Sequence, residues 1–155
     1  MANEATVIFG TEIVLEATGT STSIGDGSYY ECNDDDLQTA DVAAYPLGRF
    51  EFDTETTGFS AAPTAGYTLA LYEQRINSDG SDSPDVDANN QHTYLGSFQV
   101  DTAETGQQFL VLNGVPLNQT GGKYWLYWED GGAGTATIDA GWEFRVTPYT
   151  YGTAA

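Results

Sequence analysis

Phe50-Glu51-Phe52-Asp53 alternates apolar and acidic side chains residue by residue. Successive side chains of a β-strand point to opposite faces, so this stretch predicts a strand with both Phe rings on one face. Residues 67–72, Tyr67-Thr68-Leu69-Ala70-Leu71-Tyr72, repeat the period of two. Both stretches therefore predict β-structure near the centre of the chain.

The same alternation extends over most of the chain and predicts about nine short strands. Their ranges are 5–9, 11–17, 50–53, 67–72, 92–100, 107–112, 123–128, 135–139 and 141–147. The composition agrees, because 18 Gly and 10 Tyr are typical of tight turns and strands. The expected fold is all-β, an antiparallel two-sheet sandwich of the jelly-roll type. One parity of these strands predicts the core: Phe50, Phe52, Leu69, Leu71, Phe98, Leu126, Trp142, Phe144 and Val146.

Turn residues mark the boundaries of these strands. Asn113-Gly114 predicts a two-residue hairpin turn, and Pro116 predicts that the arm after it lies at a sheet edge or outside the hydrogen-bonded ladder. Residues 34–44 are expected to hold a short helix with an Asp cap. Since no linker divides the chain, we expect a single domain over 1–155 with a possible N-terminal arm at 1–9.

The charge balance excludes several classes of partner. The chain has 23 acidic and 4 basic residues, and Arg49, Arg75, Lys123 and Arg145 are far apart in the sequence. Binding to phosphates needs clustered Lys and Arg, so we expect no nucleic acid and no anionic membrane as partner. The absence of a long apolar run and of a signal-like N-terminus leads us to expect a product made in the cytoplasm.

Reactive residues are scarce, which argues against an enzyme. Cys32 and His92 are the only cysteine and histidine, so no disulfide and no zinc site of several such ligands is expected. No Gly-x-Ser-x-Gly motif and no complete phosphate-binding loop occurs. We therefore expect no catalytic residues, no cofactor and no resident metal.

One metal alternative stays open on acidic segments. Asp34-Asp35-Asp36 and the loop bearing Asp79 to Asp87 offer carboxylate oxygens of the kind that calcium binds. The second segment lacks the spacing of an EF-hand loop. A solvated acidic loop that aids solubility explains the same residues.

Tyr124-Trp125-Leu126-Tyr127-Trp128 is aromatic or apolar on both faces. One face is expected to fill the core, and the face with Trp125 and Tyr127 either packs under a loop or forms a subunit interface or sugar-binding platform. Tyr149 and Tyr151 add further aromatic rings beyond what one core needs. These surplus aromatics indicate a subunit interface, and we expect a homotrimer, formed either in solution or on the target.

Several strand patterns carry a resemblance to a known class of proteins. They lie at residues 67–73, 96–100, 122–128 and 140–149, the last reading Ala140-Gly141-Trp142-Glu143-Phe144-Arg145-Val146-Thr147-Pro148-Tyr149. Together they resemble small β-rich virion proteins of tailed bacteriophages, and more narrowly the jelly-roll decoration, or cement, proteins of phage capsids. The likeness covers about the last 90 residues and contains no reactive residues.

The resemblance implies a structural role on a virus particle. Such proteins commonly form trimers on the capsid exterior, bind the major capsid protein and assemble in the host cytoplasm. The expected interface residues of this chain are Val7, Ile8, Phe9, Trp125, Tyr127, Tyr149 and Tyr151.

The N-terminal segment leaves two interpretations open. Val7-Ile8-Phe9 would add a strand to a sheet edge on the capsid or on a neighbouring subunit, or would form the first strand of its own sandwich. Two other functional classes also remain: a carbohydrate-binding or receptor-binding module, and a glycoside-acting enzyme with paired carboxylates.

Overall fold

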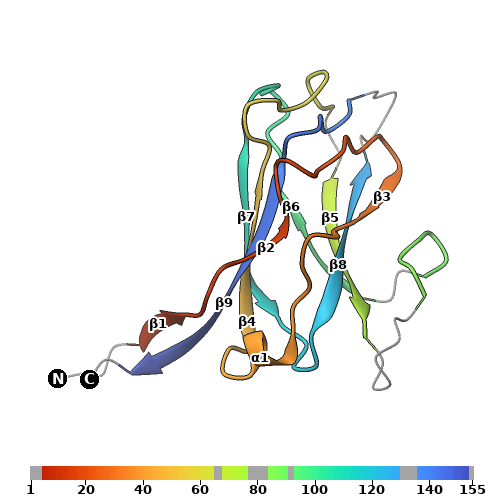
Figure 1. Cartoon of the computed structure of the whole chain (residues 1–155). Helices are drawn as coiled ribbons and strands as arrows, with labels where there is room; N and C mark the ends of the chain where they lie inside the picture. The colour runs from red at the N-terminus through yellow and green to blue at the C-terminus, as the bar shows by residue number, and fades with distance from the viewer. Residues whose placement is uncertain (1–4, 65–67, 77–83, 91–92, 130–135, 154–155) are drawn as a thin grey trace.

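The computed structural model describes residues 5–64, 68–76, 84–90, 93–129 and 136–153, in which strands form two sheets (Figure 1). The strands are β1 (Ala5–Phe9), β2 (Ile13–Glu16), β3 (Ser28–Glu31), β4 (Leu47–Asp53), β5 (Thr68–Arg75), β6 (Tyr94–Phe98), β7 (Phe109–Pro116), β8 (Gly122–Glu129) and β9 (Glu143–Thr153). A single helical turn, α1 (Thr39–Val42), precedes β4.

The two sheets form an antiparallel sandwich, which confirms the predicted fold class. One sheet has the order β1-β9-β4-β7, with β2 also paired to β9, and the other has the order β3-β8-β5-β6. From β3 onward, each strand lies in the opposite sheet from the strand that precedes it in the chain, except that β5 and β6 share a sheet. This order is compatible with a jelly roll.

The core lies between the sheets and contains all nine predicted core residues. Aromatic rings dominate it: the Phe144 centroid lies 5.8 Å from that of Phe50 and 6.0 Å from that of Phe98. The Phe52 ring stacks on Trp142 at 5.2 Å. The buried indole of Trp142 donates its N–H to the Thr22 carbonyl at 2.7 Å, so its polar atom is satisfied.

The structure corrects the predicted strands at three places. β3 was missed, because Ser28-Tyr29-Tyr30-Glu31 is half-buried at every position and lacks a clean alternation. The segment predicted as a strand at 135–139 contributes only isolated bridges from Ile138 to Ile24 and Phe59, within its described residues 136–139. β9 continues past the predicted end at 147 to Thr153.

Asn113-Gly114 is not a hairpin turn. Both residues lie inside β7, where Gly114 has a φ of 72°. On the paired strand β4, Gly48 faces Val115 and Phe50 faces Leu112, so Arg49 alone opposes two residues of β7. The positive φ expected of this dipeptide therefore produces a β-bulge. Pro116 ends β7 at the edge of its sheet, as predicted.

The predicted helix is present but its cap differs. α1 lies within residues 34–44, and its N-cap is Gln38 rather than an Asp. Asp41, at the third helical position, accepts the backbone N–H of Gln38 at 2.8 Å. The acidic side chain thus caps the helix from its third position, by accepting the backbone N–H of the N-cap residue.

Candidate functional site: a two-stranded ribbon beyond the sandwich

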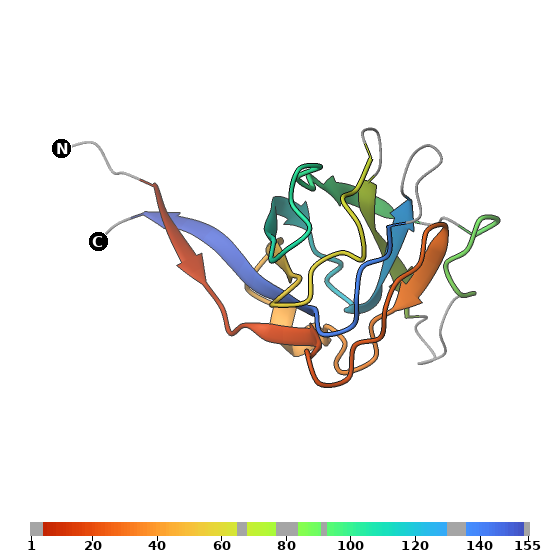
Figure 2. The ribbon, with the colours of Figure 1, turned by 90° about the horizontal axis from the view of Figure 1, so that it is seen from above.

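The chain ends of the described structure form a ribbon of two strands. β1 pairs antiparallel with the last five residues of β9, from Phe9 opposite Tyr149 to Ala5 opposite Thr153. On the other side of β9, the pairing with β4 begins only at Leu47 opposite Tyr149. We call β1 together with residues 149–153 the ribbon. It projects away from the body of the sandwich in both views (Figures 1 and 2).

One face of the ribbon is aromatic. Val7 opposes Tyr151 and Phe9 opposes Tyr149, so these four side chains share a face. The ring centroids of Phe9 and Tyr149 lie 5.9 Å apart, and those of Tyr149 and Tyr151 lie 5.8 Å apart at nearly right angles. Together with Arg49 and Asn113 they line a groove of about 260 Å³. An apolar groove therefore begins where the ribbon leaves the sandwich.

The opposite face has a single large apolar side chain, Ile8, beside Thr6, Thr150 and Gly152. Ile8 lies over Gly152, and a methyl group added to that glycine would come within 2.6 Å of the Ile8 Cδ1 atom. The glycine thus allows the aliphatic side chain to pack across the ribbon. Neither strand of the ribbon has an acidic or basic residue, in a chain whose net charge is −19.

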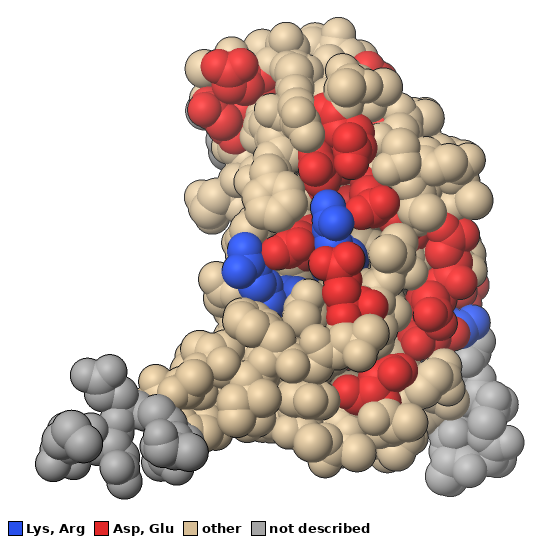
Figure 3. Space-filling model, turned by 60° about the vertical axis from the view of Figure 1, so that its left-hand side comes forward, with Lys and Arg blue, Asp and Glu red and all other residues tan. Residues whose placement is uncertain are grey.

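The ribbon exposes apolar side chains that the sandwich does not use. All five β1 residues are exposed. Of the six large hydrophobic side chains that are exposed among the described residues, four belong to the ribbon: Val7, Ile8, Phe9 and Tyr151. The ribbon appears as an uncharged tan extension beside an acidic body in Figure 3. Exposed apolar surface of this extent on a projecting element is typical of an interaction site.

Both interpretations of the N-terminal segment describe part of this arrangement. β1 is a strand of the chain's own five-stranded sheet, because it pairs with β9. Yet it lies outside the sandwich, and none of its residues belongs to the buried core. The segment is thus an arm that its own C-terminal strand supports.

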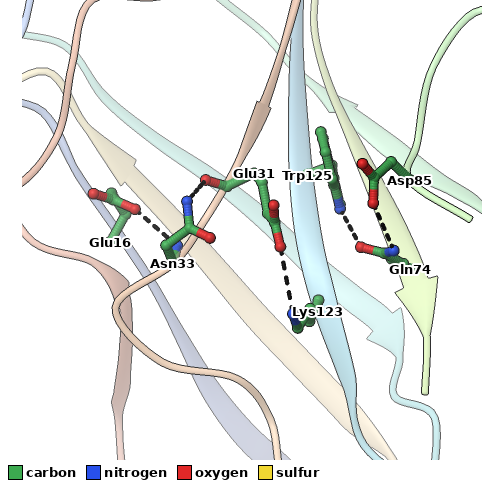
Figure 4. A network of polar contacts seen from close by, with 7 residues as sticks. All are labelled: Glu16, Glu31, Asn33, Gln74, Asp85, Lys123 and Trp125. Carbon is green, nitrogen blue, oxygen red and sulfur yellow. Dashed lines mark hydrogen bonds and ion pairs between the residues drawn. The ribbon is translucent and has the colours of Figure 1, made fainter. Parts of the chain in front are cut away.

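Trp125 lies in a different environment from the ribbon. It is only 8% exposed, and its indole N–H donates to the Gln74 Oε1 atom at 2.7 Å. The Gln74 amide in turn donates to the Asp85 carboxylate at 3.3 Å (Figure 4). Val86 of the same segment packs against Trp125 in a second apolar cluster. Trp125 therefore packs under a loop, as one of its two interpretations predicted.

Tyr127 is the more accessible member of that face. Its half-buried ring lies 4.3 Å from the ring of Tyr29, centroid to centroid. An interface role for Trp125 and Tyr127 stays a prediction. Of the two, only Tyr127 presents substantial surface.

Basic side chains are held by carboxylates on the outer face of the five-stranded sheet. Glu51 lies 2.9 Å from the Arg49 Nε atom and 3.4 Å from the Arg145 Nε atom. Arg145 also lies 3.1 Å from Glu143. On the other sheet, Lys123 lies 3.4 Å from Glu31 (Figure 4). These contacts occupy three of the four basic residues of the chain.

The acidic segments considered for calcium hold their carboxylates in local contacts. The Asp87 Oδ1 atom accepts the backbone N–H groups of Asn89 and Asn90 at 2.7 and 2.9 Å. Asp34 accepts the Ala17 N–H at 2.6 Å. Asp79 and Asp82 lie outside the described residues. Within the described ranges, no group of three potential metal ligands comes together.

Cys32 is a free cysteine buried in the core, and it is not a candidate nucleophile. Its side chain is buried in the main cluster, and burial raises the pKa of its thiol well above the ordinary value. A protonated, inaccessible thiol is unreactive. His92 lies outside the described residues.

A second feature, a pocket near Glu73, was missed by the sequence analysis. The Glu73 side chain is 3% exposed, accepts a hydrogen bond from the Asn118 amide at 3.1 Å, and has a pKa raised by burial. It lines a pocket of about 580 Å³ with Arg75 and the exposed ring of Tyr94. In the sequence, the available signal was that Glu73 follows Leu69 and Leu71 at a spacing of two on β5, which places its side chain on the same inward face.

In the part of the chain that the structure describes, no helix combines the length and the apolar character needed to cross a membrane. Comparisons of the chain with protein-family models, with curated proteins and with solved structures found no match.

Proposed function

We propose that this chain is a non-enzymatic decoration, or cement, protein that binds the major capsid protein on the outside of a tailed-phage head and stabilises the shell as a homotrimer. The projecting ribbon is the observation that supports this proposal most. It joins the sandwich only at its base and keeps Val7, Ile8 and Phe9 out of the core. A cement protein needs such a contact surface that its own folding does not consume.

The charge distribution fits a place on the particle exterior. The body is strongly acidic, and like-charged particles repel one another. The ribbon, in contrast, has no charged side chain. An uncharged contact element on an acidic body lets the protein dock through one end while the other end faces solvent.

The direct test compares virions of the source phage with and without this protein. The protein should be a band of the purified virion, and particles lacking it should lose their DNA at lower temperature or lower salt. Adding the purified full chain back should restore resistance. If deficient particles resist heat and low salt as well as complete ones do, cementing is wrong.

A matched pair of variants links this function to the ribbon. Ile8→Asp places a charge on an exposed ribbon residue, and Phe109→Asp does the same at an exposed apolar residue of the body. Ile8→Asp should abolish the restored resistance, whereas Phe109→Asp should restore it fully. Equal loss in both variants would contradict the assignment of the ribbon as the contact element.

A carbohydrate-binding or receptor-binding module is the second candidate, and the pocket near Glu73 favours it. An exposed aromatic ring beside a carboxylate, a guanidinium and an amide suits a sugar, because ring stacking and hydrogen bonds to the sugar hydroxyls would act together. All three Trp side chains are buried, so binding would fall to Tyr94. Glycan titration by NMR, with Tyr94→Ala against Phe109→Ala as the control, tests this alternative.

A further inference from the structure

The ribbon has two unlike edges that no described strand occupies. Among the described strands, β1 pairs with β9 alone, which leaves its outer edge without a described partner. The second open edge belongs to residues 150–153 of β9, because the β4 pairing stops at Tyr149. Each edge presents unpaired backbone N–H and C=O groups along a short extended strand.

An isolated pair of strands is marginally stable in water, and its open edges are templates for further strands. The ribbon has apolar side chains on both faces and no charged residue to block edge pairing. Natural edge strands are usually protected by charges, prolines or bulges. β1 has none of these devices over Ala5–Phe9, and it therefore favours addition of a strand.

We infer that the ribbon edges pair between copies of this chain: the outer edge of β1 in one copy joins the 150–153 edge of β9 in the next, and three ribbons close a six-stranded barrel. This inference rests on the proposed trimer and names the element that forms it. Since the joined edges differ, the contact is heterologous and repeats around an axis until it closes. Closure removes every free edge of the ribbons.

The strand directions allow this ring. Within one copy β1 and β9 are antiparallel. Rotation about an axis along the ribbon preserves those directions, so β1 and β9 strands alternate around the ring. Each new pair is therefore antiparallel, like the pair inside a copy. One face of each ribbon then fills the interior of the barrel, and the other lies on its outer surface, where it can contact the capsid.

A second copy fits these edges better than a foreign strand does. A single strand from another protein would pair with one edge of the ribbon and leave the other edge open. A second copy pairs with one edge and brings a free edge of its own, to which the next copy can pair until the ring closes. The ribbon also holds the contact away from the acidic bodies (Figure 2). Repulsion between copies of charge −19 remains, and salt screens it.

Light scattering on the full chain tests the inference. The mass should reach three times the 16.6 kDa of one chain, at a lower protein concentration when salt is raised. Ile8→Asp should give a monomer under the same conditions, and Tyr94→Asp, which charges an exposed ring on the body, should leave the trimer intact. Urea unfolding of both variants verifies that the monomer remains folded.

Hydrogen exchange separates edge pairing from face-to-face packing. In an isolated antiparallel ribbon, alternate amides point to the open edges and exchange rapidly. In the barrel, successive amides of both 5–9 and 150–153 should be protected, and Ile8→Asp should restore the alternating pattern. A trimer whose ribbon amides still alternate would overturn the inference.

The remaining outcomes also decide the matter. A monomer at every salt and protein concentration, a dimer, or a trimer that Ile8→Asp leaves intact overturns the barrel. A monomer that still binds and stabilises virions rejects this inference together with the proposed trimer, and leaves the proposed capsid binding and stabilisation in place. A ribbon-dependent trimer that does not bind virions supports the inference and rejects the capsid function.

Discussion

The sandwich body and the ribbon are built from strands of the same alternating type, yet their apolar side chains have opposite environments. In the body, Phe144 of β9 is 0% exposed and lies among other aromatic rings. Only seven residues later on the same strand, Tyr151 is 60% exposed. Alternation therefore predicts a strand and its two faces, but it does not say what covers each face. The ribbon retains apolar surface that the fold leaves for a partner.

The sharpest test of this difference removes one aromatic ring from each region. Phe144→Ala should lower the free energy of unfolding by about 3–5 kcal/mol, because it leaves a cavity between the sheets. Tyr151→Ala should cost less than about 1 kcal/mol in the monomer, since its ring is mostly in water already. Urea unfolding at low protein concentration measures both. Comparable losses in the two variants would show that the ribbon belongs to the same packed unit as the body.

Replacing one glycine in the body and one in the ribbon by alanine tests the same difference between the two regions. Gly58 in the body has a φ of 67°, and a methyl group added there would lie 2.0 Å from the Thr105 carbonyl oxygen. Gly58→Ala should therefore cost about 1–3 kcal/mol or more in stability, since the obstacle is backbone in a strained region. At Gly152 the obstacle is the end of the Ile8 side chain, which can rotate away.

We expect Gly152→Ala to change the free energy of unfolding by less than about 0.5 kcal/mol. Thermal unfolding of the two variants, each compared with the unmodified chain, provides the measurement. Gly106→Ala is a further control, because nothing lies within 4 Å of the added methyl group. A large loss at Gly152 would mean that Ile8 is held rigidly and that the ribbon is ordered more firmly than proposed.

Most of the body could be predicted from the sequence because one parity of each strand is buried. Phe50, Phe52 and Phe144 follow that rule, and all three are core residues. The Asn113-Gly114 bulge could not be predicted, because a positive φ fits either a hairpin turn or a bulge, and the choice depends on the pairing with β4. The sequence around Asn113-Gly114 does not show which distant strand it will pair with.

The candidate site was predicted in part. Val7, Ile8 and Phe9 stood out as apolar residues with no assigned core position, and the structure places them beside Tyr149 and Tyr151. What the sequence did not reveal is that β9 runs beyond β4 to support them. How far β9 runs beyond the sheet depends on where its partner β4 begins. The alternation within residues 149–153 contains no information about that partner.

The pH dependence of stability tests the buried Glu73 carboxyl beside its pocket. Burial raises the pKa of Glu73 above its usual value near 4.5, so the folded chain binds this proton more tightly than the unfolded chain does. Ionised Glu73 therefore destabilises the fold at neutral pH. That penalty disappears as the pH falls from the raised folded-state pKa to the unfolded value.

Glu73→Gln should thus be more stable than the unmodified chain at pH 7, and the two should converge below about pH 4.5. The substitution keeps an acceptor for the Asn118 amide. Glu129→Gln, at an exposed position, is the matched control for the removal of one carboxylate charge. A Glu73→Gln variant that is less stable than the parent at pH 7 would show that the carboxylate gains more from its partners than burial costs.

A small effect is also expected from shortening the ribbon itself. Deleting residues 2–6 removes Ala5 and Thr6, which are exposed and pair only with the end of β9. In the monomer this should lower the free energy of unfolding by less than about 1 kcal/mol, because local opening of such a segment is independent of the core. Leu15→Ala, on the neighbouring strand β2 and fully buried, should instead cost about 2–5 kcal/mol. Chemical unfolding at low concentration compares the two. If the deletion destabilises the monomer as much as Leu15→Ala does, β1 is an integral strand of the sandwich, and its apolar residues serve folding rather than assembly.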